Sequence, residues 1–258
     1  MTVTAAEVGA WLGAFLWPFM RVGALFLAAP LFGNTMLPVR VRVFAGAALT
    51  VAVMPAVGPV PALDPLSLEA LLVAAQQVLI GVAMGLLLSL AFQAVTIAGE
   101  AMSLNMGLGF ATMADPQSGV STPVLGQFLL ILSTLLFLGI GGHLLLVEVL
   151  AESFRSLPVD QAGLTRQDFI DIAFWGARMF AGGVLIALPA IAVLLTAQML
   201  LGVMTRAAPQ MNVFSVGFPI TILLGLVSLL VLVIPSLTPR MTELWREAFA
   251  VVRRILGG

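Results

Sequence analysis

The sequence contains neither cysteine nor lysine, and it has a single histidine. The absence of cysteine excludes disulfides, thiol catalysis and thiolate metal sites. His143, in the run GIGGHLLL, is not flanked by carboxylates or thiols, so it lacks the companions that a metal site of ordinary ligand count requires. We therefore expect His143 to be a satisfied core or interface residue, and we expect no metal site and no cofactor.

Charge is also scarce: 9% of the residues are charged and 61% are hydrophobic, whereas soluble domains carry roughly 25% charged residues. Stretches without any Asp, Glu or Arg cover residues 43–63, 70–99, 116–147, 179–205 and 207–239. Each is longer than the ~20 residues that a helix needs to cross the hydrocarbon core of a bilayer. The sequence therefore predicts a membrane protein, and its net charge of -1 excludes a strong nucleic-acid footprint.

The hydrophobic segments define the expected fold. Around the charge-free stretches we place about six of them, at residues 11–32, 43–62, 70–98, 124–150, 173–205 and 213–237. Backbone groups at membrane depth must bond internally, so these segments should be helices. Proline interrupts helices, and breaks are expected at Pro30, Pro55, Pro189, Pro219 and Pro235. The predicted fold is an all-α membrane protein of about six hydrophobic, partly broken helices.

The last part of the chain, residues 240–258, predicts an amphipathic helix. Apolar residues recur at helical spacing on one stripe: Leu244, Trp245, Ala248, Phe249, Val252, Ile255 and Leu256. Arg246, Glu247, Arg253 and Arg254 lie off that stripe. The pattern leaves open whether this helix covers a membrane surface or fills a partner's groove.

Few residues suggest a catalytic or proton-coupling role. Gly81 and Gly85 form a GxxxG spacing, which lets two helix backbones approach closely, and we interpret it as packing. Glu100 could pair with Glu148 in proton coupling, but a carboxylate at a helix end is commoner at an interface. Serine-triad, HExxH and paired-aspartate protease patterns are all missing, so we expect no enzyme activity.

Two interruptions stand out between the apolar runs. Residues 108–128 form a Gly-, Ser- and Thr-rich connection whose only charge is Asp115. Residues 202–219 contain Arg206 followed at once by Pro209, Gln210 and Asn212. Proline disfavours continued helix here, and the break is either a polar turn or a feature that faces a cavity or a neighbouring subunit.

An ordered set of short motifs resembles one protein family. The motifs are FLWPFMRV with Pro18 and Arg21, APLFG with Pro30 and Gly33, LPVRVR with Pro38, Arg40 and Arg42, GE at Gly99 and Glu100, DP at Asp115 and Pro116, and the run of Arg206, Pro209, Gln210 and Asn212 followed by Gly217 and Pro219. Together they cover nearly the whole chain and resemble the FliR family of export-gate proteins in bacterial type III secretion.

The resemblance implies a structural role in protein export. Such proteins join several copies of FliP and FliQ in a helical assembly at the flagellar basal body, with FlhB and FlhA alongside and unfolded flagellar proteins as cargo. The resemblance also implies helical hairpins in the inner membrane, partly displaced toward the periplasm, so that Arg21 and Arg178 meet protein in place of lipid. The expected assembly residues are Arg21, Arg40, Arg42, Glu100, Arg206, Pro209, Gln210 and Asn212.

The resemblance further implies a plug loop from about Met106 to Thr122 that closes the export channel. The expected plug residues are Met106, Gly107, Gly109, Phe110, Met113, Asp115, Pro116 and Gly119. Glycines would supply hinges, while Met and Phe would supply soft apolar surface that seals and repacks. The single domain then divides into helices at 1–98, the plug loop at 99–123, helices at 124–239 and the tail at 240–258. The plainer alternative is a loosely packed connection.

Three other functions are alternatives to this interpretation. A small-solute secondary transporter would use the break near Pro209 as a midplane site, but it should show an inverted sequence repeat, and we find no convincing one. The homologous subunit of a virulence injectisome would have the same apolar helical character but would export different cargo. An intramembrane hydrolase lacks a visible catalytic constellation.

Overall fold

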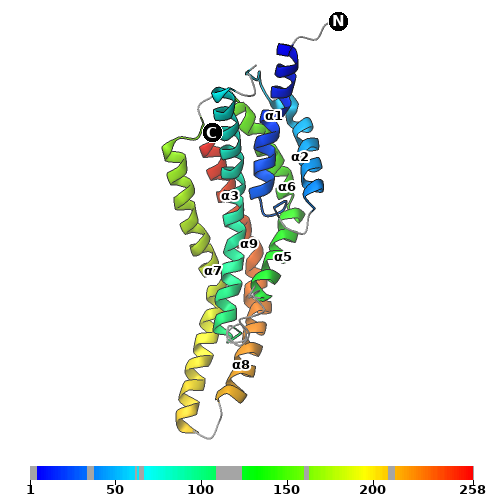
Figure 1. Cartoon of the computed structure of the whole chain (residues 1–258). Coiled ribbons are helices and arrows are strands. Elements are labelled where there is room, and N and C mark those ends of the chain that lie inside the picture. The colour runs from blue at the N-terminus through cyan, green and yellow to red at the C-terminus, as the bar shows by residue number, and fades with distance from the viewer. Residues whose placement is uncertain are drawn as a thin grey trace. The chain divides into compact units, whose positions relative to one another are not determined.

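The structure is a computed structural model that describes residues 5–33, 38–61, 63, 67–108, 124–159, 163–208 and 213–257. Every regular element in these ranges is a helix (Figure 1). In chain order they are α1 (Ala5–Ala28), α2 (Val39–Val53) with a short 3-10 turn (Met54–Ala56), α3 (Leu68–Asn105), α5 (Val124–Gly139), α6 (Gly142–Ser156), α7 (Arg166–Ala207), α8 (Val213–Ser228), a π-helical turn (Leu229–Val233) and α9 (Ile234–Ile255). The all-α prediction is confirmed.

Four helical segments of the described chain are long and apolar enough to cross a membrane. They are Val39–Ala56, Leu68–Asn105, Arg166–Ala207 and Val216–Ile255, and α5 with α6, bent by 67° at their junction, would make a fifth if the pair counts as one span. At 1.5 Å per residue, α7 is about 63 Å long, twice the ~30 Å hydrocarbon core. A membrane-crossing α7 therefore extends beyond the hydrocarbon layer.

The predicted helix breaks hold at some prolines and fail at others. Helix α1 ends at Ala28, just before Pro30, and α2 ends at Val53, just before the 3-10 turn that contains Pro55. In contrast, Pro189 lies inside α7 and Pro219 inside α8, so the breaks predicted there are wrong. A proline deletes one backbone hydrogen bond, and the intact turns on both sides keep the helix continuous.

Near Pro235, the last of the prolines predicted to break a helix, the chain changes its helical winding but the helix does not end. The chain passes from α8 through the π-helical turn Leu229–Val233 into α9, and Pro235 follows directly after that turn. The tail predicted to begin at 240 is thus the continuation of the preceding helix. An unpredicted break lies at Gly141, whose φ of +77° is natural only for glycine, and it divides the predicted 124–150 segment into α5 and α6.

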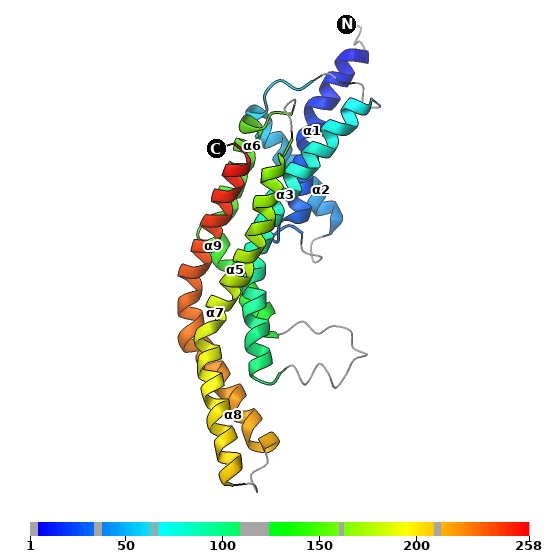
Figure 2. The same cartoon turned by 90° about the vertical axis from the view of Figure 1, so that its left-hand side faces the viewer.

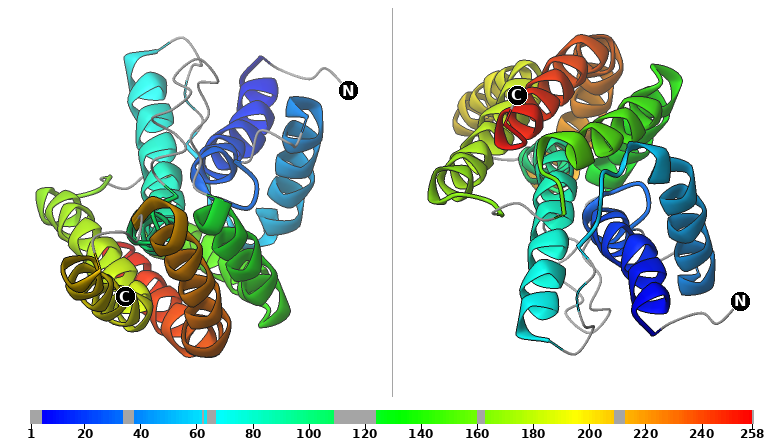
Figure 3. Two further views of the ribbon diagram at one scale, coloured as in Figure 1. Left: turned by 90° about the horizontal axis from the view of Figure 1, so that it is seen from below. Right: turned by 90° about the horizontal axis from the view of Figure 1, so that it is seen from above.

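The chain forms two compact units, and unit 1 comprises residues 1–90, 140–176 and 245–258. Within it α1 and α2 lie side by side as a hairpin (Figure 3). Helix α1 also packs closely on α3: a Cβ at Gly81 would meet the carbonyl oxygen of Arg21, and one at Gly85 would lie 2.6 Å from the Cβ of Ala28. The GxxxG spacing is therefore confirmed as a packing motif inside the fold.

Unit 2 comprises residues 91–139 and 177–244. Helices α7 and α8 run side by side in it as a second hairpin (Figure 2). The end of α3 packs on α5 through Gly99, whose missing Cβ would collide with the backbone of Gly126, and on α7 through Gly183, whose Cβ would lie 2.9 Å from the carbonyl oxygen of Ala94. Glycines at these crossings let the backbones touch, and only then can the helices pack so closely.

The amphipathic end of α9 folds back on the chain itself. Its apolar stripe is buried at Trp245, Ala248, Phe249, Val252, Ile255 and Leu256. On the polar side, Arg253 forms ion pairs with two carboxylates of α6, at 3.2 Å from Glu152 and 3.7 Å from Glu148. Neither a membrane surface nor a partner's groove is needed to cover this stripe, which corrects both alternatives raised by the sequence.

Candidate functional site

Helix α3 ends at a defined stop in unit 2. The amide of Gly107 donates to the carbonyl of Leu104 at 3.1 Å, and the amide of Leu108 donates to the carbonyl of Ser103 at 3.0 Å. Gly107 has a φ of +83°, in the left-handed region. This is the Schellman arrangement, in which a left-handed glycine turns the chain away from the helix axis. The segment that follows therefore starts from a fixed backbone geometry.

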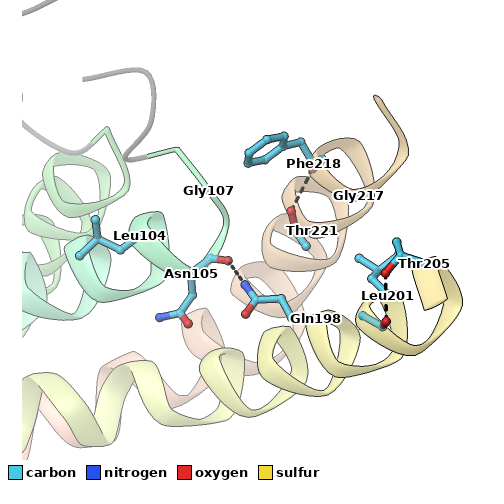
Figure 4. A pocket seen from close by; sticks show the side chains of 10 residues that line it. Leu104, Asn105, Gly107, Gln198, Leu201, Thr205, Gly217, Phe218 and Thr221 are labelled. Carbon is cyan, nitrogen blue, oxygen red and sulfur yellow. Dashed lines mark hydrogen bonds between the residues drawn. The ribbon is translucent and has the colours of Figure 1, made fainter. Parts of the chain in front are cut away.

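Two side chains from other helices hold the last carbonyls of α3. The amide of Gln198, on α7, donates through Nε2 to the carbonyl of Asn105 at 2.6 Å. The hydroxyl of Thr221, on α8, lies 3.2 Å from the carbonyl of Met106. It also lies 3.0 Å from the carbonyl of Phe218, and this second bond is drawn in Figure 4. A hydroxyl has one proton and donates to one of these carbonyls at a time. Both hairpin helices thus reach the end of α3.

Apolar contacts cover the same turn. The Phe218 ring lies against Gly107, so closely that a Cβ at Gly107 would be 2.7 Å from ring carbon Cδ1. The Met106 side chain is fully buried and lies over Gly225, where a Cβ would be 2.5 Å from the methionine sulfur. Glycine is therefore required at 107 for conformation and space, and at 225 for space.

A pocket of about 280 Å³ adjoins this turn. Its apolar wall includes Leu104, Leu201, Gly202 and Phe218, and its polar groups include Gln198 and Thr205 (Figure 4). The hydroxyl of Thr205 donates within its own helix, to the carbonyl of Gly202 at 3.0 Å. Within the pocket wall, the bonds to α3 therefore come from Gln198 and Thr221 and not from Thr205.

The predicted plug residues divide into two groups. Met106 and Gly107 belong to the stop just described, whereas Gly109, Phe110, Met113, Asp115, Pro116 and Gly119 lie outside the described residues. In this structure Gly107, which the sequence predicts as a hinge, ends α3 with a φ of +83°. Sequence analysis missed Gln198, Thr221, Phe218 and Gly225; a Gln and a Thr inside apolar runs were the signal that could have found the first two.

Arg21 occupies a second polar site, buried within unit 1. Its Nε donates to Gln77 Oε1 at 2.8 Å, one terminal nitrogen donates to the carbonyl of Ser153 at 2.7 Å, and the other donates to the carbonyl of Leu157 at 2.8 Å. Its Cζ lies 4.3 Å from the centroid of the Phe154 ring. Ser153 and Leu157 are at the C-terminal end of α6, where the helix dipole favours a positive charge.

Arg21 therefore caps α6 and ties it to α1 and α3. Its side chain is fully buried, so any contribution it makes to assembly passes through the fold of unit 1 and not through direct contact with another chain. The expectation that Arg21 meets protein in place of lipid is confirmed. Arg178 differs, because it is exposed on α7 in the isolated chain.

The remaining predicted assembly residues are scattered. Arg40, Glu100 and Arg206 are exposed on three different helices, and Arg42 is half-buried. Pro209, Gln210 and Asn212 lie outside the described residues.

His143, which the sequence predicts to be a satisfied core or interface residue, is half-buried. Its Nδ1 has no hydrogen-bond partner in the described part of the chain. Among the same residues no group of three or more His, Asp or Glu could hold a metal ion.

Fold and composition define an all-α membrane protein with two hairpins and a capped α3. The family described as bacterial export proteins, family 1, matches residues 12–248. The chain is 37% identical to the flagellar biosynthetic protein FliR of Escherichia coli (strain K12), over 99% of this chain and 97% of that protein. It is 38% identical to FliR of Pectobacterium carotovorum, with the same coverage, and 33% identical to FliR of Bacillus subtilis, over 84% of this chain and 85% of that protein. The chain belongs to the FliR family of bacterial export proteins.

As a member of the FliR family, the chain is a component of the flagellar export apparatus at the bacterial inner membrane. It acts there in a complex with other export components. These relatives are all named for flagellar biosynthesis, and none of their names denotes a solute transporter, an injectisome subunit or an enzyme.

Proposed function

We propose that this chain forms one wall of the channel through which unfolded flagellar proteins leave the cell, and that residues 106–122 close that channel at rest. In this proposal it is joined by several copies of FliP and FliQ, with FlhB and FlhA alongside. The energy for export comes from partners, because the sequence has no phosphate-binding loop. The observation that carries the proposal is the fixed stop of α3, from which the closing segment begins.

Large apolar surfaces support a multi-subunit assembly. Only 28% of the apolar window of α7 and 17% of that of α2 are buried within the chain. Phe44, Phe174 and Met199 are each about three-quarters exposed. Surfaces of this extent require lipid or other protein chains to cover them.

The exposed charges favour protein for part of that cover. Arg40, Glu100, Arg178 and Arg206 are exposed on otherwise apolar helices, and a charge at the centre of a bilayer costs ~2.5 kcal/mol or more unless it meets a partner or water. A location partly displaced from the bilayer toward the periplasm, with neighbouring subunits against these side chains, removes that cost. We propose the same for Pro209, Gln210 and Asn212, as residues of the α7–α8 connection at a subunit interface.

The composition of the closing segment supports its role. Phe110 and Met113 offer apolar side chains, of which the methionine is flexible, and Asp115 is the only charge. A gate must seal against ions and yet open at low cost, and methionine and phenylalanine side chains with glycines between them suit both demands.

Deleting residues 109–122 tests the proposed closure. The deletion keeps Gly107 and Leu108, so the cap of α3 remains intact. We expect the complex to be recovered in normal amounts and the membrane of cells that produce it to leak small ions well above the wild-type level, because the closing segment is gone. The measurement is the rate of membrane depolarisation in growing cells, alongside recovery of the complex.

The matched control replaces residues 109–122 by a Gly-Ser sequence of the same length. If the channel is closed by the apolar side chains, this variant leaks as the deletion does, because flexible polar residues seal poorly. Wild-type leakage from an intact assembly that carries the deletion would contradict closure by this segment.

A further inference from the structure

One side of α7 within unit 2 carries a continuous row of exposed residues. They recur every three or four positions from Arg178 to Arg206, so in a helix of 3.6 residues per turn they fall within an arc of about 100°. Two small members of the row are Ala181 and Ala192. The larger apolar members are Leu185, Leu188, Leu195, Met199 and Val203. We call this surface the α7 stripe.

An exposed arginine closes each end of the α7 stripe. Arg178 and Arg206 lie about 42 Å apart along the helix, at 1.5 Å per residue. No ion pair joins either of them to a residue that the structure describes. Residues 179–205, which lie between them, carry no charge. A guanidinium is always charged and its planar fork suits a carboxylate, so the stripe requires two anionic groups at this spacing.

Lipid alone covers the α7 stripe incompletely. The charge-free stretch between the two arginines is about 40 Å long, whereas the hydrocarbon core of a bilayer measures ~30 Å. Lipid tails around an untilted helix therefore leave about 10 Å of apolar face uncovered. A helix of another protein has no such limit of length. The small side chains of Ala181 and Ala192 also let a second helix backbone come close to α7.

A second exposed face of unit 2, on α8, has a different character. It is formed by Ile220, Leu223, Leu226 and Val227, which are all bulky and apolar. Residues 207–239 carry no charge, so lipid tails cover this face at no electrostatic cost. Of these two faces, the α7 stripe is the one that combines apolar surface with charges in need of a partner.

We propose that the α7 stripe is the docking surface for an apolar helix of a neighbouring export subunit, and that this helix carries an aspartate or glutamate opposite each of Arg178 and Arg206. The inference rests on the proposed function, which supplies the assembly, and it adds the face that is covered and the chemistry of the partner. Two charge pairs about 42 Å apart also fix the register of the two helices, because a slip by one turn separates both pairs.

The absence of lysine makes these charge pairs directly testable. Arg178→Lys and Arg206→Lys keep the positive charge, and each variant has a single lysine. A carbodiimide joins an ammonium group to a carboxylate that touches it: an amide bond forms, and the water that is lost converts the carbodiimide to a urea. In the assembly extracted from membranes, we expect each introduced lysine to be joined to an aspartate or glutamate of another subunit. Mass spectrometry of the cross-linked peptides identifies both residues.

The wild type and Arg155→Lys are the controls. The wild type has no lysine, and Arg155 is exposed on α6 in unit 1, outside the α7 stripe. We expect neither control to form adducts between subunits through a lysine. Adducts from Arg155→Lys in the same yield as from the stripe variants would overturn the assignment of the pairs to the α7 stripe.

Removal of the two charges gives a second measurement. Hydrogen bonds to charged groups change an equilibrium by about 10-fold or more. We therefore expect Arg178→Gln with Arg206→Gln to lower the amount of the neighbouring subunit recovered with this chain by at least about 10-fold. Arg155→Gln should leave that amount unchanged. Wild-type recovery for the double variant would contradict the proposed pairs.

The outcomes separate this inference from the proposed function. An intact assembly in which neither lysine couples, or only one does, overturns the two-ended match, and the uncoupled arginine then meets lipid phosphate or water. Coupling to a second copy of this chain overturns it as well. If the wild-type chain is extracted without other subunits, the proposed function fails, and the docking inference falls with it.

Discussion

A protein carrying Gly81→Val will melt at a markedly lower temperature than the wild type, because the new side chain meets the backbone of α1. An added Cβ would collide with the carbonyl oxygen of Arg21 and lie 2.9 Å from the Cβ of Ala24 and 3.0 Å from the amide nitrogen of Leu25. Backbone atoms cannot rotate away as a side chain can. We expect a loss of about 3 kcal/mol, which corresponds to roughly 6–12 °C in the melting temperature of the detergent-solubilised protein.

Gly176→Ala is the control for this substitution. Gly176 is also helical, but an added Cβ there has no neighbour within 4 Å. Alanine in place of helical glycine should be neutral or stabilise by about 0.5–1 kcal/mol. Equal melting temperatures for Gly81→Val and the wild type would show that α1 and α3 do not pack through this glycine.

Replacing Arg21 by methionine is expected to have an effect of similar size. The substitution leaves the buried carbonyl of Ser153, the half-buried carbonyl of Leu157 and the side-chain oxygen of Gln77 without the donor that now satisfies them. Buried polar groups left without partners cost about 1–3 kcal/mol each, so we expect a total loss of about 3–5 kcal/mol. The measurement is thermal unfolding and the yield of folded protein in mild detergent.

Two further variants separate geometry from charge. Arg21→Lys keeps the charge but cannot donate in the three directions of a guanidinium, so its stability should fall between those of Arg21→Met and the wild type. Arg155→Met removes an exposed arginine from α6, the helix that Arg21 caps, and should change the melting temperature little. If Arg21→Met melts as Arg155→Met does, the capping role assigned to Arg21 is wrong.

The sequence was sufficient for those features that depend on local composition. Charge-free runs of more than 20 residues predict helices, and α2, α3, α7 and α8 lie where such runs do. The GxxxG spacing likewise indicated close packing, although it could not say that α1 is the partner. An arginine in an apolar segment indicated protein surroundings for Arg21, yet its acceptors lie 56 to 136 residues away in the chain.

Other features depend on tertiary contacts that no local pattern encodes. The amphipathic stripe of α9 predicts an apolar cover, but only the fold shows that the chain supplies this cover itself. The stop at Gly107 depends on Phe218, Gln198 and Thr221, which follow it by some 90 to 115 residues. Pro189 and Pro219 were expected to break helices because proline does so on average, and their surroundings keep both helices intact.

The two polar sites hold helices together within each of the two units. Arg21 fixes α1, α3 and α6 within unit 1, and the Gln198 and Thr221 pair fixes the end of α3 within unit 2. The interior of each unit is therefore held together, whereas the outer faces of α2 and α7 are apolar and mostly uncovered. A chain of this kind is suited to be one part of a larger helical assembly, in agreement with its membership in the FliR family.

The central claim is that this chain works as one subunit of a multi-subunit export channel. Native mass spectrometry of the tagged protein, extracted gently from its own host, tests that claim most directly. The account predicts a large assembly that contains this chain together with several copies of two small helical membrane proteins. Recovery of the chain as a monomer or a homodimer, without such companions, would contradict it.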